Sequence, residues 1–153
     1  MFKVKYLVLF LIINFGGLAI GAWLMNDGPQ SLWYANLSKA PWTPPGWVFG
    51  AAWTTIMILF SIYLTYLFSR NYSDKKLSLY IIQVVFNVSW NYIFFNQHQV
   101  LLAQIVITLL TALIFYFFFT FFKEQKSKSY LLLPYMIWLC IATSLNLYVL
   151  VHN

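Results

Sequence analysis

The stretch that decides how this chain folds is Trp33-Tyr34-Ala35-Asn36-Leu37-Ser38-Lys39-Ala40-Pro41-Trp42-Thr43-Pro44-Pro45-Gly46-Trp47. It separates two long apolar runs. It holds three of the seven tryptophans. Prolines fix φ and remove backbone donors, so the loop is stiff and cannot continue a regular helix. Pro44-Pro45 suits a helix start, with Thr43 as the predicted N-cap. Such a loop at a membrane surface would form a lid over a pocket between helices.

The composition on either side of this loop is that of a membrane protein. Of 153 residues, 62% are hydrophobic and only 8% are charged, whereas soluble domains average about 25% charged. One domain, 1–153, is expected at this length. The net charge of +6 does not indicate a nucleic-acid partner, because the basic residues lie between apolar runs rather than on one face. A lipid bilayer is the partner that they indicate.

Five apolar runs are each close to the roughly 20 residues that cross a bilayer core. They are 6–25, 46–68, 77–95, 100–122 and 130–151, with 26–45 as the lid loop. None of these runs contains Asp, Glu, Lys or Arg. Runs this long and continuous satisfy their backbone polar groups as helices rather than as barrel strands. The sequence therefore predicts an all-α membrane protein, a bundle of five transmembrane helices.

The basic residues predict the topology of this bundle. With five spans, eight of the nine basic residues share one side, and only Lys39 lies opposite. The positive-inside rule then puts the N-terminus in the cytoplasm, if the protein lies in a bacterial cell membrane. The first run also has signal-peptide features, namely a basic start and the small residues 19–22. We expect it to be retained, because it is long for a signal and the charge pattern works with it in place.

The lid stretch resembles the signature of the tryptophan-rich sensory protein family, whose animal members are called translocator proteins. The matching residues are Trp33, Tyr34, Leu37, Lys39, Trp42, Pro44, Pro45, Trp47, Gly50 and Trp53. The segments 83–95 and 134–146 match as well, so the resemblance covers nearly the whole chain in order. One proline is displaced, since Ala40 precedes Pro41, and Met57 replaces a family tyrosine.

The resemblance implies a pocket that binds tetrapyrroles such as protoporphyrin, and flat aromatic drug-like molecules, without a covalent cofactor. Indole faces stack on planar π-systems and a few amides fix orientation, which agrees with this implication. Some members of the family degrade bound porphyrin in light, which here would involve Trp53 and Trp138. Whether this chain turns over its ligand stays open, because its residues form no conventional catalytic constellation.

The third apolar run has a polar face that suits either packing or binding. Gln83, Asn87 and Asn91 are four apart, and Trp90 borders the same face. Amides in hydrocarbon need partners, so this face should point into the bundle. Interhelical hydrogen bonding and ligand contact are both open on this pattern, and the resemblance favours ligand contact for Gln83 and Asn87.

The fifth run carries a second candidate face. Trp138, Ala142, Leu145 and Asn146 share it, with a large aromatic above a small alanine. Close helix packing is the ordinary reading of such a notch, whereas the family resemblance assigns this face to the pocket. The predicted ligand-binding set is Tyr34, Trp53, Gln83, Asn87, Trp90, Trp138, Ala142 and Leu145.

Other conspicuous residues have structural explanations. Trp23, Trp33, Trp42 and Trp47 lie near one predicted membrane surface and are interpreted as interfacial anchors. Cys140 is expected to be a small buried hydrophobe. His98 and His152 are expected to be solvated, with no carboxylate or cysteine at a ligand spacing, so no metal site is predicted.

Three functions remain open at this level: a tetrapyrrole-binding sensor or receptor, a transporter of such molecules, and a light-dependent porphyrin-degrading enzyme. We favour the first, because the spans lack the intramembrane carboxylate of proton-coupled pumps. The residues after Tyr148 include no Lys or Arg, so cholesterol should not bind tightly. Gly17-x-x-x-Gly21 would permit a homodimer.

Overall fold

All regular secondary structure in the part of the chain that the computed structural model describes, residues 2–153, is helical. The five long helices are α1 (Val4–Leu24), α3 (Gly46–Arg70), α4 (Asp74–Asn91), α5 (Val100–Gln125) and α6 (Leu133–His152). Short helical segments occupy the connections: η1 (Gly28–Gln30), α2 (Leu32–Asn36), the π-helical turn η2 (Tyr92–Asn96) and η3 (Lys126–Leu132). The all-α prediction is confirmed.

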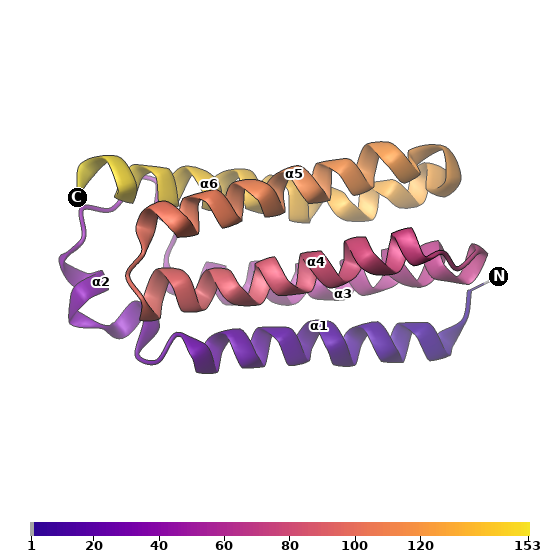
Figure 1. Ribbon diagram of the computed structural model, residues 1–153, viewed down its shortest axis with the longest axis horizontal. Helices are drawn as coiled ribbons and strands as arrows, with labels where there is room; N and C mark the ends of the chain where they lie inside the picture. Colours follow the sequence, from indigo (N-terminus) through magenta and orange to yellow (C-terminus); the bar gives the residue numbers. More distant parts are fainter. Residues whose placement is uncertain (1) are drawn as a thin grey trace.

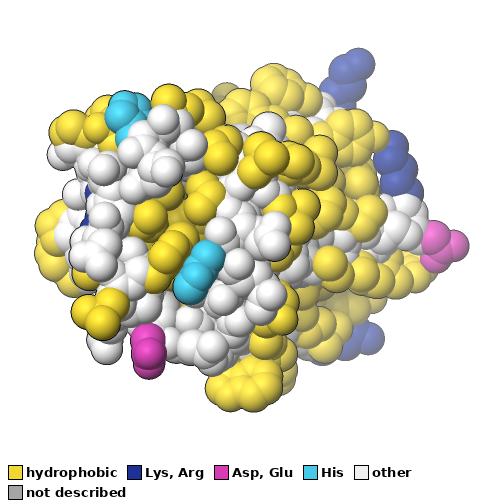
Figure 2. Space-filling view, turned by 60° about the vertical axis from the view of Figure 1, so that its left-hand side comes forward, with side chains coloured by type: hydrophobic (Ala, Val, Ile, Leu, Met, Phe, Trp, Pro, Cys, Tyr) yellow, Lys and Arg dark blue, Asp and Glu magenta, His cyan; other side chains and the backbone are white. Residues whose placement is uncertain are grey.

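The long helices lie side by side and alternate in direction (Figure 1). Helix α1 packs against α3 and α4, α4 packs against α5, and α5 packs against α6. We call the end formed by residues 2–5, 70–76 and 123–132 the basic end. The opposite end, formed by 25–45, 96–100 and 149–153, is the lid end. Figure 2 turns the lid end toward the viewer, and most of the visible Lys and Arg side chains lie at the far end.

Four continuous helical stretches among the described residues are long and apolar enough to cross a membrane: Val4–Gln30, Gly46–Arg70, Asp74–Asn96 and Val100–His152. The last is 53 residues long and folds back on itself at η3 (Figure 1). One bilayer crossing takes about 20 residues, so this stretch has the length of two crossings.

The start of α3 differs from the sequence prediction. Pro45 is the residue before the helix, with an extended backbone (φ −57°, ψ 149°), and no side chain caps the first turn. Thr43 instead donates from Oγ1 to the carbonyl of Ala40, at 2.7 Å. The prediction of Thr43 as N-cap was wrong, because the two prolines hold the chain extended beyond it and leave Thr43 in its own turn. The lid also contains η1 and α2, so it is not an irregular loop throughout.

The best-packed part of the bundle is the half toward the basic end. Its side chains from α3, α5, η3 and α6 have no exposed surface: Phe60, Tyr63, Leu64, Leu67, Ile114, Phe117, Leu132 and Leu139. Aromatic edges hold this half together, for example Phe60 against Tyr135 with ring centroids 5.3 Å apart. Because lipid tails are as apolar as these side chains, close van der Waals packing is what favours their association.

Polar side chains join the helices inside this packed half. Asn14 on α1 donates to Ser61 on α3 (2.9 Å) and accepts from the Tyr80 hydroxyl on α4 (2.8 Å). At the basic end, Lys76 forms an ion pair with Glu124 (2.7 Å) and donates to Asn71. Except for Lys76 and Asn71, which are five residues apart, these partners are 47 to 66 residues apart in the sequence, so no local pattern indicated them.

Two sequence-based expectations, on the small-residue motif of α1 and on Cys140, differ from the structure. Gly21 of the small-residue motif is buried, and a Cβ there would lie 2.7 Å from Asn91. Gly17 faces Val88 in the same way, at 3.5 Å. This motif therefore packs α1 against α4 within the chain, and a dimer would need another face. Cys140 is exposed, so the expectation that it is buried was wrong; a helix apolar all round does not reveal which side faces lipid.

Candidate functional site

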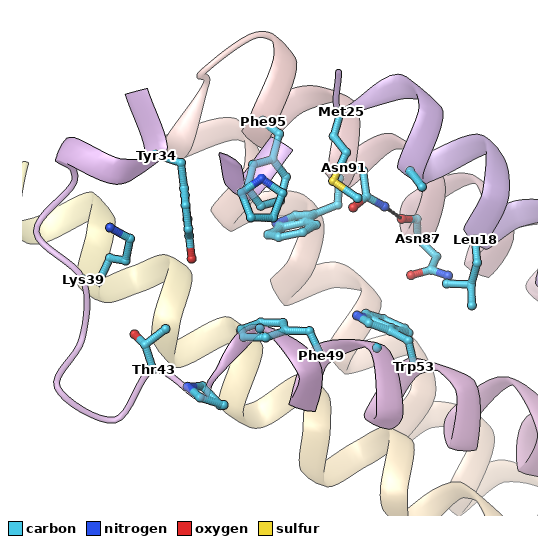
Figure 3. A pocket seen from close by; sticks show the side chains of 16 residues that line it. Leu18, Met25, Tyr34, Lys39, Thr43, Phe49, Trp53, Asn87, Asn91 and Phe95 are labelled. Carbon is cyan, nitrogen blue, oxygen red and sulfur yellow. Dashed lines mark hydrogen bonds between the residues drawn. The ribbon is translucent and has the colours of Figure 1, made fainter. Parts of the chain in front are cut away.

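A cavity of about 560 Å³ lies at the lid end, between the lid and the ends of α1, α3 and α4. Figure 3 shows lid residues on one side of it, α3 residues below, and α4 residues opposite α3. Its lining comprises Leu18, Ala22, Met25, Pro29, Tyr34, Lys39, Thr43, Pro44, Gly46, Phe49, Gly50, Trp53, Asn87, Trp90, Asn91 and Phe95. The volume is within the roughly 300–1,000 Å³ of small-molecule sites, and the mixture of aromatic walls with few polar groups is typical of them.

The α3 wall alternates small and large residues. Gly46, Phe49, Gly50 and Trp53 follow the helical period of three to four, so one helix face presents all of them to the cavity. A Cβ at Gly46 or Gly50 would meet no heavy atom within 4 Å. The two glycines therefore leave the space that the aromatic residues frame.

The lid supplies polar groups to the side of the cavity between α3 and α4. Ser31 caps α2 by accepting from the backbone N–H of Tyr34 (3.2 Å), which fixes the direction of the Tyr34 side chain into the cavity (Figure 3). Burial raises the pKa of the Tyr34 phenol above its usual value of 10.0, because the phenolate would lose solvation. The phenol is therefore neutral at physiological pH and can donate a hydrogen bond.

Lys39 is the basic residue of this wall. Its ammonium lies 4.8 Å from the centre of the Tyr34 ring and donates to the carbonyl of Ala35 (3.2 Å). Among residues 2–153, the single ion pair joins two residues at the other end of the molecule, so no described carboxylate neutralises Lys39. A ligand carboxylate would find its counter-ion here.

Helix α4 contributes amides and an indole. The Asn91 amide donates to the backbone carbonyl of Asn87 (3.2 Å), while the Asn87 side chain points toward the cavity (Figure 3). The Trp90 indole N–H is already engaged with Asn146 of α6 (3.1 Å). Trp90 therefore offers the cavity its ring rather than its donor, whereas Asn87 offers a polar group.

Two small hollows lie between this cavity and α6. One, of about 40 Å³, is lined in part by Trp53, Trp138 and Ala142. The other, of about 50 Å³, is lined in part by Tyr34, Ala142 and Leu145. Phe49 and Trp90 line all three spaces. These two rings therefore separate the main cavity from α6.

The predicted site residues fall into three groups. Four line the main cavity: Tyr34, Trp53, Asn87 and Trp90. Three lie on α6, along the small hollows beyond the two separating rings: Trp138, Ala142 and Leu145. Gln83 lines none of these spaces, because its amide donates to the Tyr135 hydroxyl (2.8 Å) in the packed half. Gln83 and Asn87 are one helical turn apart on α4, and the cavity ends between them.

Some lining residues were missed by sequence reasoning. Phe49 is four residues before Trp53 on the same helix face, a spacing that could have found it. Lys39 is the only basic residue at its end of the bundle, which also was a usable signal. Met25 and Phe95 carried none, because they follow the ends of regular helices, where the direction of a side chain depends on the connection.

The lid is held against the end of α6. Ser38 and Asn153 exchange two hydrogen bonds, backbone N–H to Oδ1 at 2.8 Å and Nδ2 to the carbonyl at 3.2 Å. The Trp42 indole N–H donates to Ser144 (3.1 Å), so this tryptophan is a contact of the lid as well as a surface residue. The lid is thereby attached to two points of one helix.

The remaining tryptophans and histidines lie outside the cavity. Trp23 and Trp47 are 78% and 74% exposed, as interfacial anchors would be. Trp33 stacks on His98, with ring centroids 4.0 Å apart. No group of three His, Cys, Asp or Glu side chains suited to a metal ion occurs within residues 2–153.

Comparison with known proteins gives one consistent result. The TspO/MBR family profile matches residues 8–152. A tryptophan-rich sensory protein of Cereibacter sphaeroides is 33% identical over 114 residues, covering 74% of this chain and 72% of its own. A translocator protein of Homo sapiens is 31% identical over 119 residues, covering 74% and 70%. A tryptophan-rich protein TspO of Archaeoglobus fulgidus is 30% identical over 123 residues, covering 79% and 80%.

Proposed function

This chain belongs to the TspO/MBR family of membrane proteins, and on that premise we propose that its lid-end cavity binds a tetrapyrrole of the protoporphyrin class. The observation that carries the proposal is the pairing, in one cavity, of aromatic faces with a lysine that has no described carboxylate partner. Protoporphyrin is a planar π-system that bears carboxylates at one edge. Phe49, Trp53 and Trp90 would stack against the ring system, and Lys39 would pair with a carboxylate.

A receptor or sensor role is the form of this function that we favour. The Cereibacter sphaeroides relative is named a sensory protein, and the human relative a translocator. Transport against a gradient needs a source of coupling, and the cavity lining contains no carboxylate that could bind a coupling proton. Binding under a lid that is attached to α6 requires only that occupancy changes the lid or that helix.

Light-dependent degradation is a second candidate with an observation of its own. Trp53 and Trp138 line the same hollow of about 40 Å³, and the Trp138 ring lies edge-on to Phe49 with centroids 5.2 Å apart. The Trp138 indole N–H is buried and has no partner among the described residues. Two indoles so close to a bound porphyrin would be oxidisable groups near an excited ligand.

Titration of purified protein with protoporphyrin, in darkness and in light, separates these candidates. Quenching of porphyrin fluorescence without product supports binding. Loss of the porphyrin spectrum in light, dependent on the protein, supports the enzyme, and flux into sealed vesicles supports transport.

Lys39→Gln should weaken the binding of protoporphyrin by roughly tenfold, because it removes a partly buried ion pair. The same substitution should leave the binding of a neutral planar ligand unaffected. Absence of saturable binding would refute the proposal.

We also propose that α1, α3, α4, α5 and α6 each cross the bilayer, with the N-terminus in the cytoplasm of a bacterial cell. All basic residues except Lys39 then lie on the cytoplasmic side. In a Cys140→Ala background, a cysteine at Gln97 should react with an impermeant thiol reagent added outside, and one at Ser127 should not. The opposite pattern would show that the orientation is reversed. Equal labelling of the two positions would contradict a membrane crossing by α5, which lies between them.

Sterol binding is expected to be weak in this member of the family. Tyr148 is stacked on His152, with ring centroids 3.8 Å apart, and no Lys or Arg follows it. His152→Arg should raise sterol affinity if a cation beside this tyrosine is what a sterol hydroxyl requires. Tight, saturable binding of cholesterol by the unmodified chain would contradict the expectation.

A further inference from the structure

A second large cavity lies at the basic end, remote from the proposed tetrapyrrole site. Its volume is about 550 Å³. Arg70 from the end of α3 and Lys126 and Lys128 from η3 line it, together with the aromatic side chains of Phe2 and Tyr66. Three cations and two aromatic rings thus surround one space where the chain leaves its apolar helices.

The positive charge of this cavity is not cancelled from within. Glu124 is the acidic residue in the lining, and its carboxylate is paired with Lys76 at 2.7 Å. The other charged side chains at this end are the cations Lys3, Lys5, Lys75 and Lys123 and the anion Asp74. Their balance reinforces the positive potential, so an anion entering the cavity meets uncompensated cations.

The cations are held in place by the surrounding structure. Arg70 donates from Nη1 to the carbonyl of Glu124 (2.8 Å), which leaves its other N–H groups free to face an anion. The Lys128 ammonium lies 4.9 Å from the centre of the Tyr66 ring, and Phe2 packs on the same ring at 4.9 Å. The aromatic pair forms an apolar wall directly beside the cations.

The backbone conformation at Lys126 also indicates that the surrounding structure holds this turn in place. Its φ of 51° with ψ of −125° is a conformation that glycine adopts far more readily than lysine. Such a conformation is unfavourable and persists where the surrounding structure requires it, often at ligand sites. Here the turn carries the chain from α5 into η3, and both lysines on η3 line the cavity.

We propose that this cavity binds the phosphate headgroup of an anionic phospholipid. Arg and Lys donors match phosphate oxygens, and the Phe2–Tyr66 wall suits the start of an acyl chain. A lipid is favoured over a free phosphate because the cavity opens where apolar helices end, at the depth of lipid headgroups. The proposal is independent of the tetrapyrrole site, which lies at the opposite end of the helices.

Native mass spectrometry of the full chain in detergent, with phosphatidylglycerol or phosphatidylcholine, tests this proposal. We expect one phosphatidylglycerol to be retained in preference to phosphatidylcholine. The Lys126→Gln/Lys128→Gln variant should lose this preference by roughly tenfold, as expected for two basic residues that act near an anionic headgroup. The matched control is Lys75→Gln/Lys123→Gln, which removes the same charge outside the cavity and should keep the preference.

Three outcomes would overturn the proposal. The first is unchanged retention of phosphatidylglycerol by the Lys126/Lys128 variant. The second is an equal loss in the Lys75/Lys123 control, which would show diffuse attraction to the whole basic end. The third is full displacement of the lipid by inorganic phosphate at equimolar concentration, which would make this a site for a free anion. Protoporphyrin binding, measured on the same samples, should be unaffected in both variants and confirms that they are folded.

Discussion

The two halves of this bundle differ in how the same kinds of side chain are used. Toward the basic end, aromatic rings such as Phe60 and Tyr63 have no exposed surface and pack on one another. Toward the lid, Phe49 and Trp53 are only partly buried and border a cavity of about 560 Å³. Aromatic content alone does not distinguish a packed region from a binding region; the presence of glycines and of a connecting lid does.

The largest effect should come from truncating an aromatic residue of the packed half. Phe60→Ala removes a fully buried ring and should lower the free energy of unfolding by about 3–5 kcal/mol, because a cavity replaces its contacts. Phe49→Ala is the matched variant at the lid end and should cost clearly less, since it enlarges a space that already exists. Thermal unfolding in detergent measures both, and equal losses would contradict the division into two halves.

Breaking the partly buried ion pair between Lys76 and Glu124 should come next in size. Lys76→Met leaves the Glu124 carboxylate, which is 22% exposed, without its partner. We expect a loss of about 3 kcal/mol, the lower end of the range for broken buried pairs. Adding Glu124→Gln should recover most of it. The control is Lys75→Met at an exposed position; if it destabilises as much, general charge rather than the pair is responsible.

Ligand affinity should respond to the lid half alone. Ala142→Thr fills part of the hollow behind Phe49, whose ring also lines the main cavity. Through that ring it should weaken tetrapyrrole binding by roughly 1–3 kcal/mol, the usual cost of overpacking. Trp53→Phe should weaken the binding of the same ligand, because the ring area that contacts it is smaller. It should also suppress any photodegradation. Isothermal titration with protoporphyrin measures both. Wild-type affinity in a folded Trp53→Phe variant would contradict the assignment of this pocket.

A smaller effect is expected from releasing the lid. Asn153→Ala removes the two hydrogen bonds to Ser38, each worth about 0.5–1.5 kcal/mol. Hydrogen exchange should quicken in residues 31–45 and remain unchanged in α3 beyond Trp53. Association and dissociation of the ligand should both accelerate. Unchanged exchange in the lid would show that these bonds do not hold it closed.

The smallest effect should be at an interfacial tryptophan. Trp23 is 78% exposed and lines none of the cavities described above. Trp23→Phe should leave tetrapyrrole affinity unchanged within error and alter stability by less than about 0.5 kcal/mol. A marked loss of affinity would move the site toward the outer surface of α1.

Sequence reasoning reached the helices more easily than the site. Apolar runs predicted every long helix, and the structure extends α3 by two residues to Arg70 and α5 by three residues to Gln125. The residues that periodicity grouped also line common spaces in the structure, Asn87 with Trp90 and Trp138 with Ala142. Periodicity did not reveal that the Phe49 and Trp90 rings separate the main cavity from α6, because separation depends on how three helices meet.

By itself, the sequence determined that the chain is a membrane protein, which end is basic, and which motif covers the bundle. These properties follow from composition, run length and proline geometry, which are local. Only the tertiary structure decided that Gln83 pairs with Tyr135, that Cys140 faces outward and that Lys76 finds Glu124. In a helix that is apolar all round, no pattern marks the inner face, so contacts between distant helices decide which residues pack and which line a cavity.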